Sequence, residues 1–291
     1  MFEITFVKFL SVITNPAHYF YIEMNTMNKF LLVILVMFAS CEPNKKENAD
    51  QQASVAGGEE QRLKELAGKF PDSLILKENL IQYYRENGNY ETALLEVNRA
   101  LEKDSMNARL WDIKAILHFE DADTLSSITA FEKALAIVPN PADLISLGTL
   151  YAQTGNKKAL ELAGYLLSRH KADTEKEALF IKGLYFAFTN DNMQAVDYFD
   201  QCIALNFTFM DAYREKAIAL YNMAKYGEAL SVLDKAITLQ NNFDEGYYYM
   251  GKCYEKLNRK QDAIESYQTA LLYSPDYTEA KDALARLGVK Y

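Results

Sequence analysis

The chain has 291 residues, of which 49% are hydrophobic and 24% are charged, as is usual for a globular protein. Its formal net charge of -9 argues against nucleic acid as a partner, because a phosphate backbone is held by clustered Lys and Arg side chains. Gly and Pro are sparse (12 and 6), while helix-favouring residues are abundant, so the composition predicts an all-helical chain. The three cysteines are too few and too scattered to form a disulfide framework, and Cys202 and Cys253 are interpreted as small buried side chains.

An apolar run occupies residues 30–39 and is followed by Ser40 and Cys41. It is too short to cross a membrane, since a spanning helix needs about 20 residues, but it fits the hydrophobic region of a signal peptide. The residues from Phe38 to Cys41 resemble the lipobox of bacterial lipoproteins. This resemblance implies that the signal region, residues 1–41, is cleaved before Cys41, that Cys41 carries the lipid, and that the protein is anchored in the bacterial cell envelope, at the outer membrane.

The residues before this run fit a signal peptide less well, because a signal normally begins a few residues before its apolar region. Met27 is therefore interpreted as the start, with Met24 as a second possibility. The alternative is that residues 1–28 form an amphipathic or membrane segment. Residues 42–58 are polar and lack the apolar side chains needed to fold, so they are expected to form a flexible tether.

A spaced pattern of small and aromatic residues recurs from Leu74 to Tyr277. Its clearest copy is the last, with Gly251, Tyr254, Ala263, Tyr267, Ala270 and Pro275. The pattern resembles the frame of the tetratricopeptide repeat, a helical hairpin with a period of about 34 residues. The copies cover residues 74–107, 108–140, 141–175, 176–209, 210–243 and 244–277, with the domain spanning 59–291.

This resemblance implies an all-α fold, a right-handed superhelix (solenoid) of about six helical hairpins, because each hairpin must bury its apolar face against its neighbours. Residues 59–70 are expected to form an N-terminal capping helix and residues 278–288 a C-terminal one. In the third copy Ala159 comes one residue early, which makes its second helix the least regular.

Motifs for catalysis are missing from the sequence: it has no phosphate-binding glycine loop, no HExxH and no paired cysteines at zinc spacing. His118 stands at a bulky frame position and is interpreted as a packed side chain. The sequence therefore predicts a protein that is not an enzyme and that binds no cofactor or metal.

The face that the frame leaves open is the predicted binding site. In the family, the first helices of the hairpins line a concave groove. The residues expected to contact a ligand there are Phe119, Phe180, Leu184, Phe188, Arg214, Ile218, Tyr221, Tyr248 and Lys252. The alternative is that tight superhelical winding buries some of them. Glu78, Gln82, Ile116 and Ile145 stand where chaperone-binding members carry Lys and Asn, which argues against a partner held by its terminal carboxylate.

The sequence therefore indicates a membrane-anchored scaffold that holds an extended peptide or a helix of another envelope protein. A second hypothesis is a glycan-binding lipoprotein of a nutrient-uptake system, suggested by the consecutive Tyr247, Tyr248 and Tyr249. The chain leaves no room for the large sugar-binding region that such proteins carry in addition.

Overall fold

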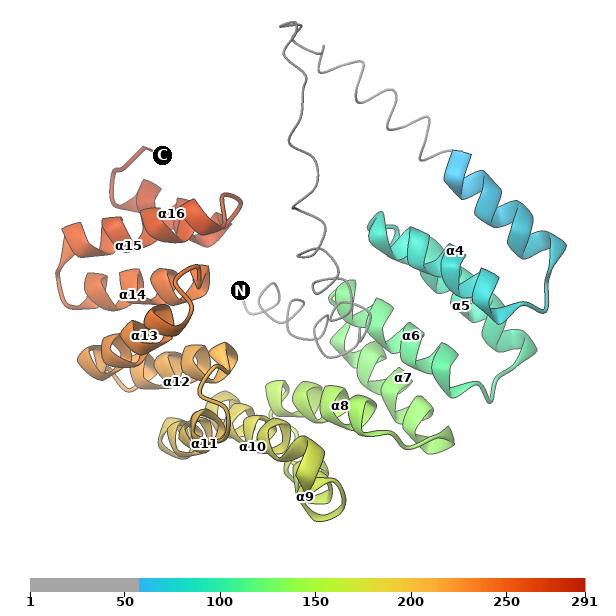
Figure 1. Ribbon diagram of the computed structural model, residues 1–291, viewed down its shortest axis with the longest axis horizontal. Helices are drawn as coiled ribbons and strands as arrows, with labels where there is room; N and C mark the ends of the chain where they lie inside the picture. Colours follow the sequence, from blue (N-terminus) through green and yellow to red (C-terminus); the bar gives the residue numbers. More distant parts are fainter. Residues whose placement is uncertain (1–57, 291) are drawn as a thin grey trace, which may run out of the picture. The chain divides into compact units, whose positions relative to one another are not determined.

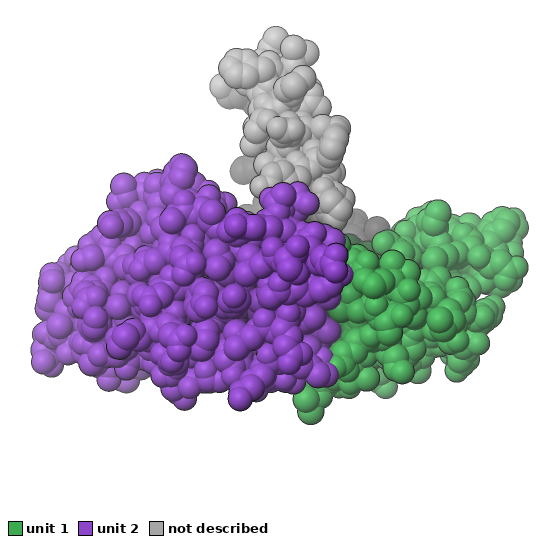
Figure 2. Space-filling view, turned by 90° about the horizontal axis from the view of Figure 1, so that it is seen from below, with its two compact units in different colours: residues 1–143 green, residues 144–291 purple. Residues whose placement is uncertain are grey.

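The computed structural model describes residues 58–290, and within this range all regular secondary structure is helical (Figure 1). The signal region predicted for 1–41, the lipidation site Cys41 and residues 42–57 of the predicted tether lie outside the described residues. Residue 58, predicted to end the tether, already begins a helix. No helix among the described residues is both long and apolar enough to cross a membrane. The chain divides into two compact units, residues 1–143 and 144–291 (Figure 2).

The described part of unit 1 consists of successive antiparallel helices. They are an unlabelled helix at 58–69, α4 (Leu74–Glu86), α5 (Tyr90–Lys103), α6 (Ala108–Glu120) and α7 (Thr124–Ile137). Each helix from α4 onward packs on the next along the chain. A buried cluster joins the helix at 58–69 to α4, α5 and α6 through Leu63, Tyr84, Val97 and Leu110. The helix at 58–69 thus packs on α4, as expected of an N-terminal capping helix.

Unit 2 continues the same alternation of helices. They are α8 (Pro141–Gln153, which begins just before the unit boundary), α9 (Lys158–Arg169), α10 (Lys171–Phe188), α11 (Asn192–Leu205), α12 (Met210–Asn222), α13 (Tyr226–Leu239), α14 (Asp244–Lys256), α15 (Lys260–Tyr273) and α16 (Thr278–Arg286). From α9 onward each helix contacts its successor, and α12 also contacts α10 and α14. The first helices of neighbouring hairpins therefore lie side by side.

Five of the six first helices begin at the residue where a repeat was predicted to start, and α10 is the exception. It begins at Lys171 rather than Lys176 and has 18 residues, whereas the other first helices have 13. Residues 171–175 contain neither Gly nor Pro, so nothing in them stops a helix. The preceding α9 has only 12 residues, so the irregularity expected from Ala159 appears as a shorter second helix followed by a longer first helix.

The turn inside each hairpin contains a residue with a left-handed backbone. These residues are Gly88, Ala122, Gly155, Asn190, Ala224 and Asn258, with φ between 58° and 69°. Each occupies the fifteenth position of its repeat. Gly and Asn adopt this conformation readily, but a Cβ makes it costly for the two alanines.

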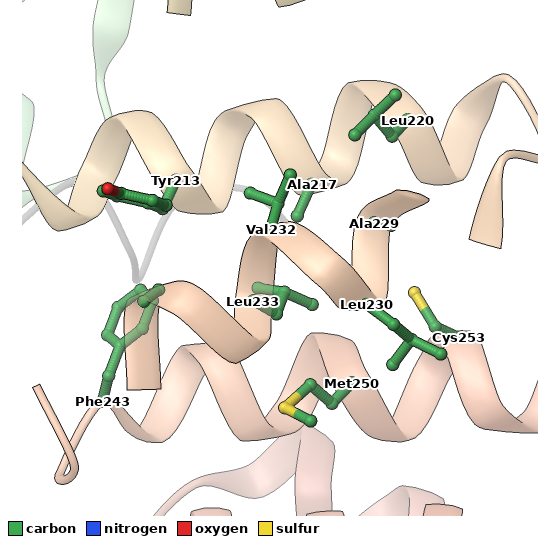
Figure 3. Packing of buried hydrophobic residues seen from close by; sticks show 11 residues of the cluster. Tyr213, Ala217, Leu220, Ala229, Leu230, Val232, Leu233, Phe243, Met250 and Cys253 are labelled. Carbon is green, nitrogen blue, oxygen red and sulfur yellow. The ribbon is translucent and has the colours of Figure 1, made fainter. Parts of the chain in front are cut away.

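Small residues set the distance between the two helices of a hairpin. A Cβ added to Gly183 would lie 2.5 Å from Cε1 of Phe199, which is fully buried. In the cluster formed by α12, α13 and α14, Ala217 and Ala229 lie among larger side chains such as Leu233 and Met250 (Figure 3). Cys253 belongs to this cluster, and Cys202 is likewise buried, which confirms the interpretation of both cysteines as core residues.

Candidate functional site

The first helices of unit 2 carry the partly exposed residues of the predicted groove. Phe188 lies at the end of α10, Ile218 and Tyr221 on α12, and Tyr248 and Lys252 on α14; each is intermediate in exposure. Because α12 contacts both α10 and α14, these five residues come from adjacent helices of a single unit. We refer to them as the inner-face residues.

Phe180 and Leu184 differ from the prediction that they lie open to a ligand. Phe180 is 2% exposed and Leu184 is 3% exposed. The ring centroid of Phe180 lies 5.6 Å from that of Phe199 on α11 and 5.0 Å from that of Phe209, which precedes α12. Phe180 thus fills the space between successive hairpins, as the alternative of burial by winding allowed. The prediction of open ligand contacts is wrong for these two side chains.

Phe119, on α6 of unit 1, is also nearly buried, at 9% exposure. The prediction that it lies in an open groove is therefore corrected as well. Removal of its large apolar side chain from water is energetically favourable, which explains why Phe119 is buried. The structure brings together the inner-face residues of unit 2, whereas Phe119 belongs to unit 1.

Arg214 is buried in an ion-pair network and is not an open groove residue. Its guanidinium lies 2.8 Å from Asp211, 3.0 Å from Glu215 and 2.7 Å from Glu245 on α14. Burial would lower the pKa of Arg214, but the surrounding carboxylates raise it well above its ordinary value. Burial raises the pKa of Glu215 and of Glu245, and Arg214 opposes both shifts. The predicted contact residue therefore joins two hairpins.

Other ion pairs also connect first helices of successive repeats. Arg109 lies 2.6 Å from Glu78, Arg286 lies 2.6 Å from Glu255, and Arg85 donates to Glu120 through Nε and Nη2. The partners are separated by 31 or 35 residues in the sequence. Oppositely charged residues separated by about one repeat period are a signal that sequence reasoning missed. That reasoning assigned each charged side chain to its own helix and not to a pair between repeats.

Asp112 and Asp143 form a pair of carboxyl groups in unit 1. Asp143 is 7% exposed and accepts a hydrogen bond from the Asn140 side chain at 2.7 Å. Burial and the nearby Asp143 raise the pKa of Asp112 to about 7. Burial also raises the pKa of Asp143, against the opposing effect of Asn140. The two groups therefore share a proton below neutral pH, because both cannot ionise cheaply at close range.

Lys252 lies among three tyrosine rings. Its Nζ is 5.0 Å from the ring centroid of Tyr221, 5.7 Å from that of Tyr248 and 4.9 Å from that of Tyr249. These distances are in the range of cation–π contacts. Burial lowers the pKa of Lys252. We call Lys252 with Tyr221, Tyr248 and Tyr249 the lysine–tyrosine cluster.

The three consecutive tyrosines do not present one common surface. Tyr248 contacts the rings of Tyr249, Tyr267 and Tyr277. Tyr247 instead stacks on Tyr273, with ring centroids 5.8 Å apart, and donates a hydrogen bond to the Asn241 carbonyl. The run of three tyrosines suggested a glycan-binding surface. Tyr248 packs against other tyrosines, whereas Tyr247 stacks separately on Tyr273, so the three rings do not form one such surface.

The described residues contain no group of three or more His, Cys, Asp or Glu side chains placed to hold a metal ion. Burial raises the pKa of the Cys202 and Cys253 thiols to about 12, so neither is a thiolate at neutral pH. His118 lies 3.6 Å from Asp123, and burial lowers the pKa of His118. These groups therefore have surroundings that favour packing over chemistry.

Comparison with known proteins agrees with the hairpin architecture. The tetratricopeptide repeat family model matches residues 61–142, and the model described as regulator of microtubule dynamics protein 1-3 matches residues 208–289. The Hsp70-Hsp90 organizing protein of Triticum aestivum is 26% identical over 219 residues. That alignment covers 72% of this chain but 36% of the wheat protein, so the chain spans about a third of this relative.

Solved structures show the same fold. A tetratricopeptide repeat protein from Parabacteroides merdae ATCC 43184 superposes with a TM-score of 0.69 at 19% identity, covering 84% of this chain and 96% of the other. PilW, a type IV pilus biogenesis factor, superposes with a TM-score of 0.58 at 20% identity, covering 72% of this chain and 97% of its own. Together with the hairpins, these matches show an all-α superhelical fold of the tetratricopeptide repeat type.

Proposed function

We propose that the inner-face residues of unit 2 bind an extended peptide or a helix of another protein. The tetratricopeptide fold suggests a protein interaction scaffold. The observation that carries the proposal is that Ile218, Tyr221 and Tyr248 remain partly exposed on the adjacent first helices α12 and α14, although other apolar side chains of these helices, such as Leu220 and Met250, are buried. Apolar and aromatic side chains grouped in this way favour a protein partner.

The binding face is tested best with a photo-crosslinking amino acid at Ile218. In intact cells this position should crosslink to a partner, and Phe188→Ser together with Tyr221→Ser should abolish the crosslink. The control places the same amino acid at Leu239, which is 45% exposed on the second helix α13. A partner captured equally from both positions, or unaffected by the two substitutions in a folded protein, would contradict the proposal.

We also propose that the scaffold is a lipoprotein of the bacterial envelope, anchored through Cys41 at the outer membrane, and that its partner is an envelope protein. The lipobox resemblance supports this proposal. Metabolic labelling with an alkyne-tagged fatty acid should mark the chain, and Cys41→Ala should abolish the label. Cys202→Ala serves as the control, since Cys202 is buried. A label that persists in Cys41→Ala would exclude lipidation at this cysteine.

A further inference from the structure

Three second helices of unit 2 end on an exposed apolar residue. Leu205 ends α11, Leu239 ends α13 and Tyr273 ends α15, so successive members are separated by one repeat period of about 34 residues. Phe207 follows α11 and Leu272 precedes Tyr273, and all five residues are between 42% and 74% exposed. Equivalent positions of stacked repeats lie along the same edge of a solenoid. We call this row of five residues the apolar edge.

Tyr247 of α14 links two parts of this edge. Its hydroxyl lies 3.2 Å from the carbonyl oxygen of Asn241, in the turn that follows Leu239 and α13. Its ring is stacked on that of Tyr273, with the centroids 5.8 Å apart. The ends of α13 and α15 are therefore joined through one side chain, so the members of the row are neighbours in space as well as in the repeat pattern.

The apolar edge lies in uncharged sequence. Residues 201–210, 236–243 and 266–275 contain the edge and its turns, and they include no Asp, Glu, Lys or Arg, although 24% of the chain is charged. Their polar side chains are neutral amides and hydroxyls. The corresponding residues 99–108 of unit 1 include charged side chains of both signs. The combination of exposed apolar residues and absent charge is thus a property of these repeats of unit 2 and not of every repeat.

An uncharged apolar row is suited to the boundary of a lipid bilayer. A charged side chain would have to lose its hydration there, whereas Leu and Phe gain free energy by leaving water. Tyr is favoured at this boundary because its ring is apolar while its hydroxyl stays hydrated. A row of five residues is small for a protein partner or a second copy, since a stable protein interface uses about 20 to 30 residues on each side.

We propose that the apolar edge inserts into the headgroup region of a bilayer, as a reversible membrane contact in addition to the lipid anchor. The inference rests on the anchor proposed at Cys41 for its source of lipid. Residues 42–57 separate Cys41 from the first described helix, and a chain of this length spans about 60 Å at most. An anchored chain therefore keeps its folded repeats close to the bilayer, where a high effective concentration favours weak contacts.

The contact leaves the proposed peptide site accessible. The apolar edge belongs to second helices and the turns after them, whereas the inner-face residues lie on the first helices α10, α12 and α14. The formal net charge of -9 disfavours an anionic lipid surface, so the insertion of apolar side chains, rather than charge, supplies the affinity. Zwitterionic lipid is accordingly the expected ligand.

The test uses residues 42–291, which contain all described residues but neither Cys41 nor the apolar run before it. We expect this chain to float with phosphatidylcholine vesicles in a density gradient. Phe207→Ser together with Leu272→Ser should lower its vesicle partition coefficient by about tenfold or more, because two apolar side chains no longer gain by leaving water. Both positions are exposed, so the fold should be retained, which circular dichroism checks.

The matched control changes two exposed apolar residues at the other end of the same helices. Met193 lies near the start of α11 and Leu257 shortly before α15, at 67% and 41% exposure. Met193→Ser together with Leu257→Ser should leave the partition coefficient unchanged. Fluorescence then locates the contact: brominated phosphatidylcholine should quench Phe207→Trp more strongly than Met193→Trp, with Trp111 contributing the same background to both.

Several outcomes would overturn the inference. These are no association of the folded chain with vesicles, equal losses in the two double variants, equal quenching at positions 207 and 193, or association with phosphatidylglycerol vesicles alone. A dimer that dissociates in Phe207→Ser with Leu272→Ser, without vesicle association, would assign the edge to a second copy instead. The proposed anchor fails separately: a chain that carries no fatty-acid label but still binds vesicles would refute lipidation at Cys41 and leave the affinity of the edge for lipid standing.

Discussion

Gly251 of α14 faces the ring of Tyr267 of α15 so closely that a Cβ added to the glycine would lie 2.5 Å from Cε1 and 2.7 Å from Cδ1 of the ring. Tyr267 is fully buried, and its hydroxyl donates to Glu255. The ring therefore cannot move away without breaking a hydrogen bond. This contact holds the two helices of the last repeat together.

The first prediction concerns this contact. Gly251→Ala should lower the free energy of unfolding by about 1 to 3 kcal/mol, because the added methyl overpacks a rigid neighbour. Gly164→Ala, in the interior of α9 where a Cβ meets nothing within 4 Å, should raise it by about 0.5 to 1 kcal/mol. Urea unfolding followed by circular dichroism measures both. If both substitutions change the free energy of unfolding equally, the Tyr267 ring moves aside to accommodate the added methyl.

Arg214 should be essential for stability and should make it depend on pH. Arg214→Met leaves three carboxylates without their cation and should cost about 3 to 5 kcal/mol. The folded-state pKa values of Glu215 and Glu245 are raised, so the folded protein retains protons that the unfolded chain has released. Stability from these groups is thus present at low pH and is lost as the pH rises through their folded pKa values.

The loss in Arg214→Met should therefore be larger at pH 8 than at pH 5. Arg99→Met is the matched control, since Arg99 is 67% exposed and pairs only with Glu96 on its own helix; it should change stability by less than about 0.5 kcal/mol. A pH-independent loss in Arg214→Met would mean that packing of the side chain, rather than its charge, joins the hairpins.

Asp112→Asn should stabilise unit 1 above neutral pH. The folded-state pKa of Asp112 is raised to about 7, so the stability it contributes is complete below its ordinary pKa and falls as the pH rises toward 7. Removing the charge should raise the free energy of unfolding at pH 8 by more than about 1 kcal/mol, since one pKa unit corresponds to about 1.4 kcal/mol.

Fluorescence of Trp111, the only tryptophan and a neighbour of Asp112 in the sequence, reports unfolding of this unit. Asp121→Asn, at the exposed end of α6, is the control and should leave the pH dependence unchanged. If wild type and Asp112→Asn lose stability equally between pH 5 and pH 8, the carboxyl pair does not hold a proton in the folded state.

Ala224→Gly should stabilise unit 2 although it removes a side chain. Ala224 has φ of 58°, a conformation that costs an L-residue about 1 to 2 kcal/mol, and glycine escapes this cost at the expense of a more flexible unfolded chain. A net gain of about 0.5 to 1 kcal/mol is expected. Ala204→Gly within α11 should instead destabilise by about 0.5 to 1 kcal/mol. Thermal unfolding of both variants distinguishes a relieved backbone from a general effect of glycine.

Much of the fold could be predicted because each repeat position has a local physical requirement. Gly251 and Ala263 must be small where helices approach, and Tyr267 must be large where hairpins meet, so their spacing alone indicates paired helices. The start of α10 could not be predicted in the same way. The frame assumes equal hairpins, and a shortened α9 is compensated by a longer α10, which depends on how both helices pack.

The candidate site was less predictable than the fold. Position in the repeat indicated which side chains belong to the first helices. By this criterion Phe180 and Ile218 were both predicted to contact a ligand, but only Ile218 remains partly exposed. The difference lies in the neighbours: Phe180 meets Phe199 and Phe209 across hairpins. Arg214 was likewise identified as a contact residue, and its three carboxylates, including Glu245 one repeat away, explain why it is buried.

The sequence by itself determined the helical class, the repeat period and the small and aromatic residues of the frame, because these follow from contacts within one period of the chain. Only the tertiary structure decided which groove positions stay accessible, which charges between repeats pair, and that Lys252 rests on Tyr221 and Tyr249 without a carboxylate partner among the described residues. These properties depend on side chains of adjacent repeats, whose separation in space is set by packing rather than by distance along the sequence.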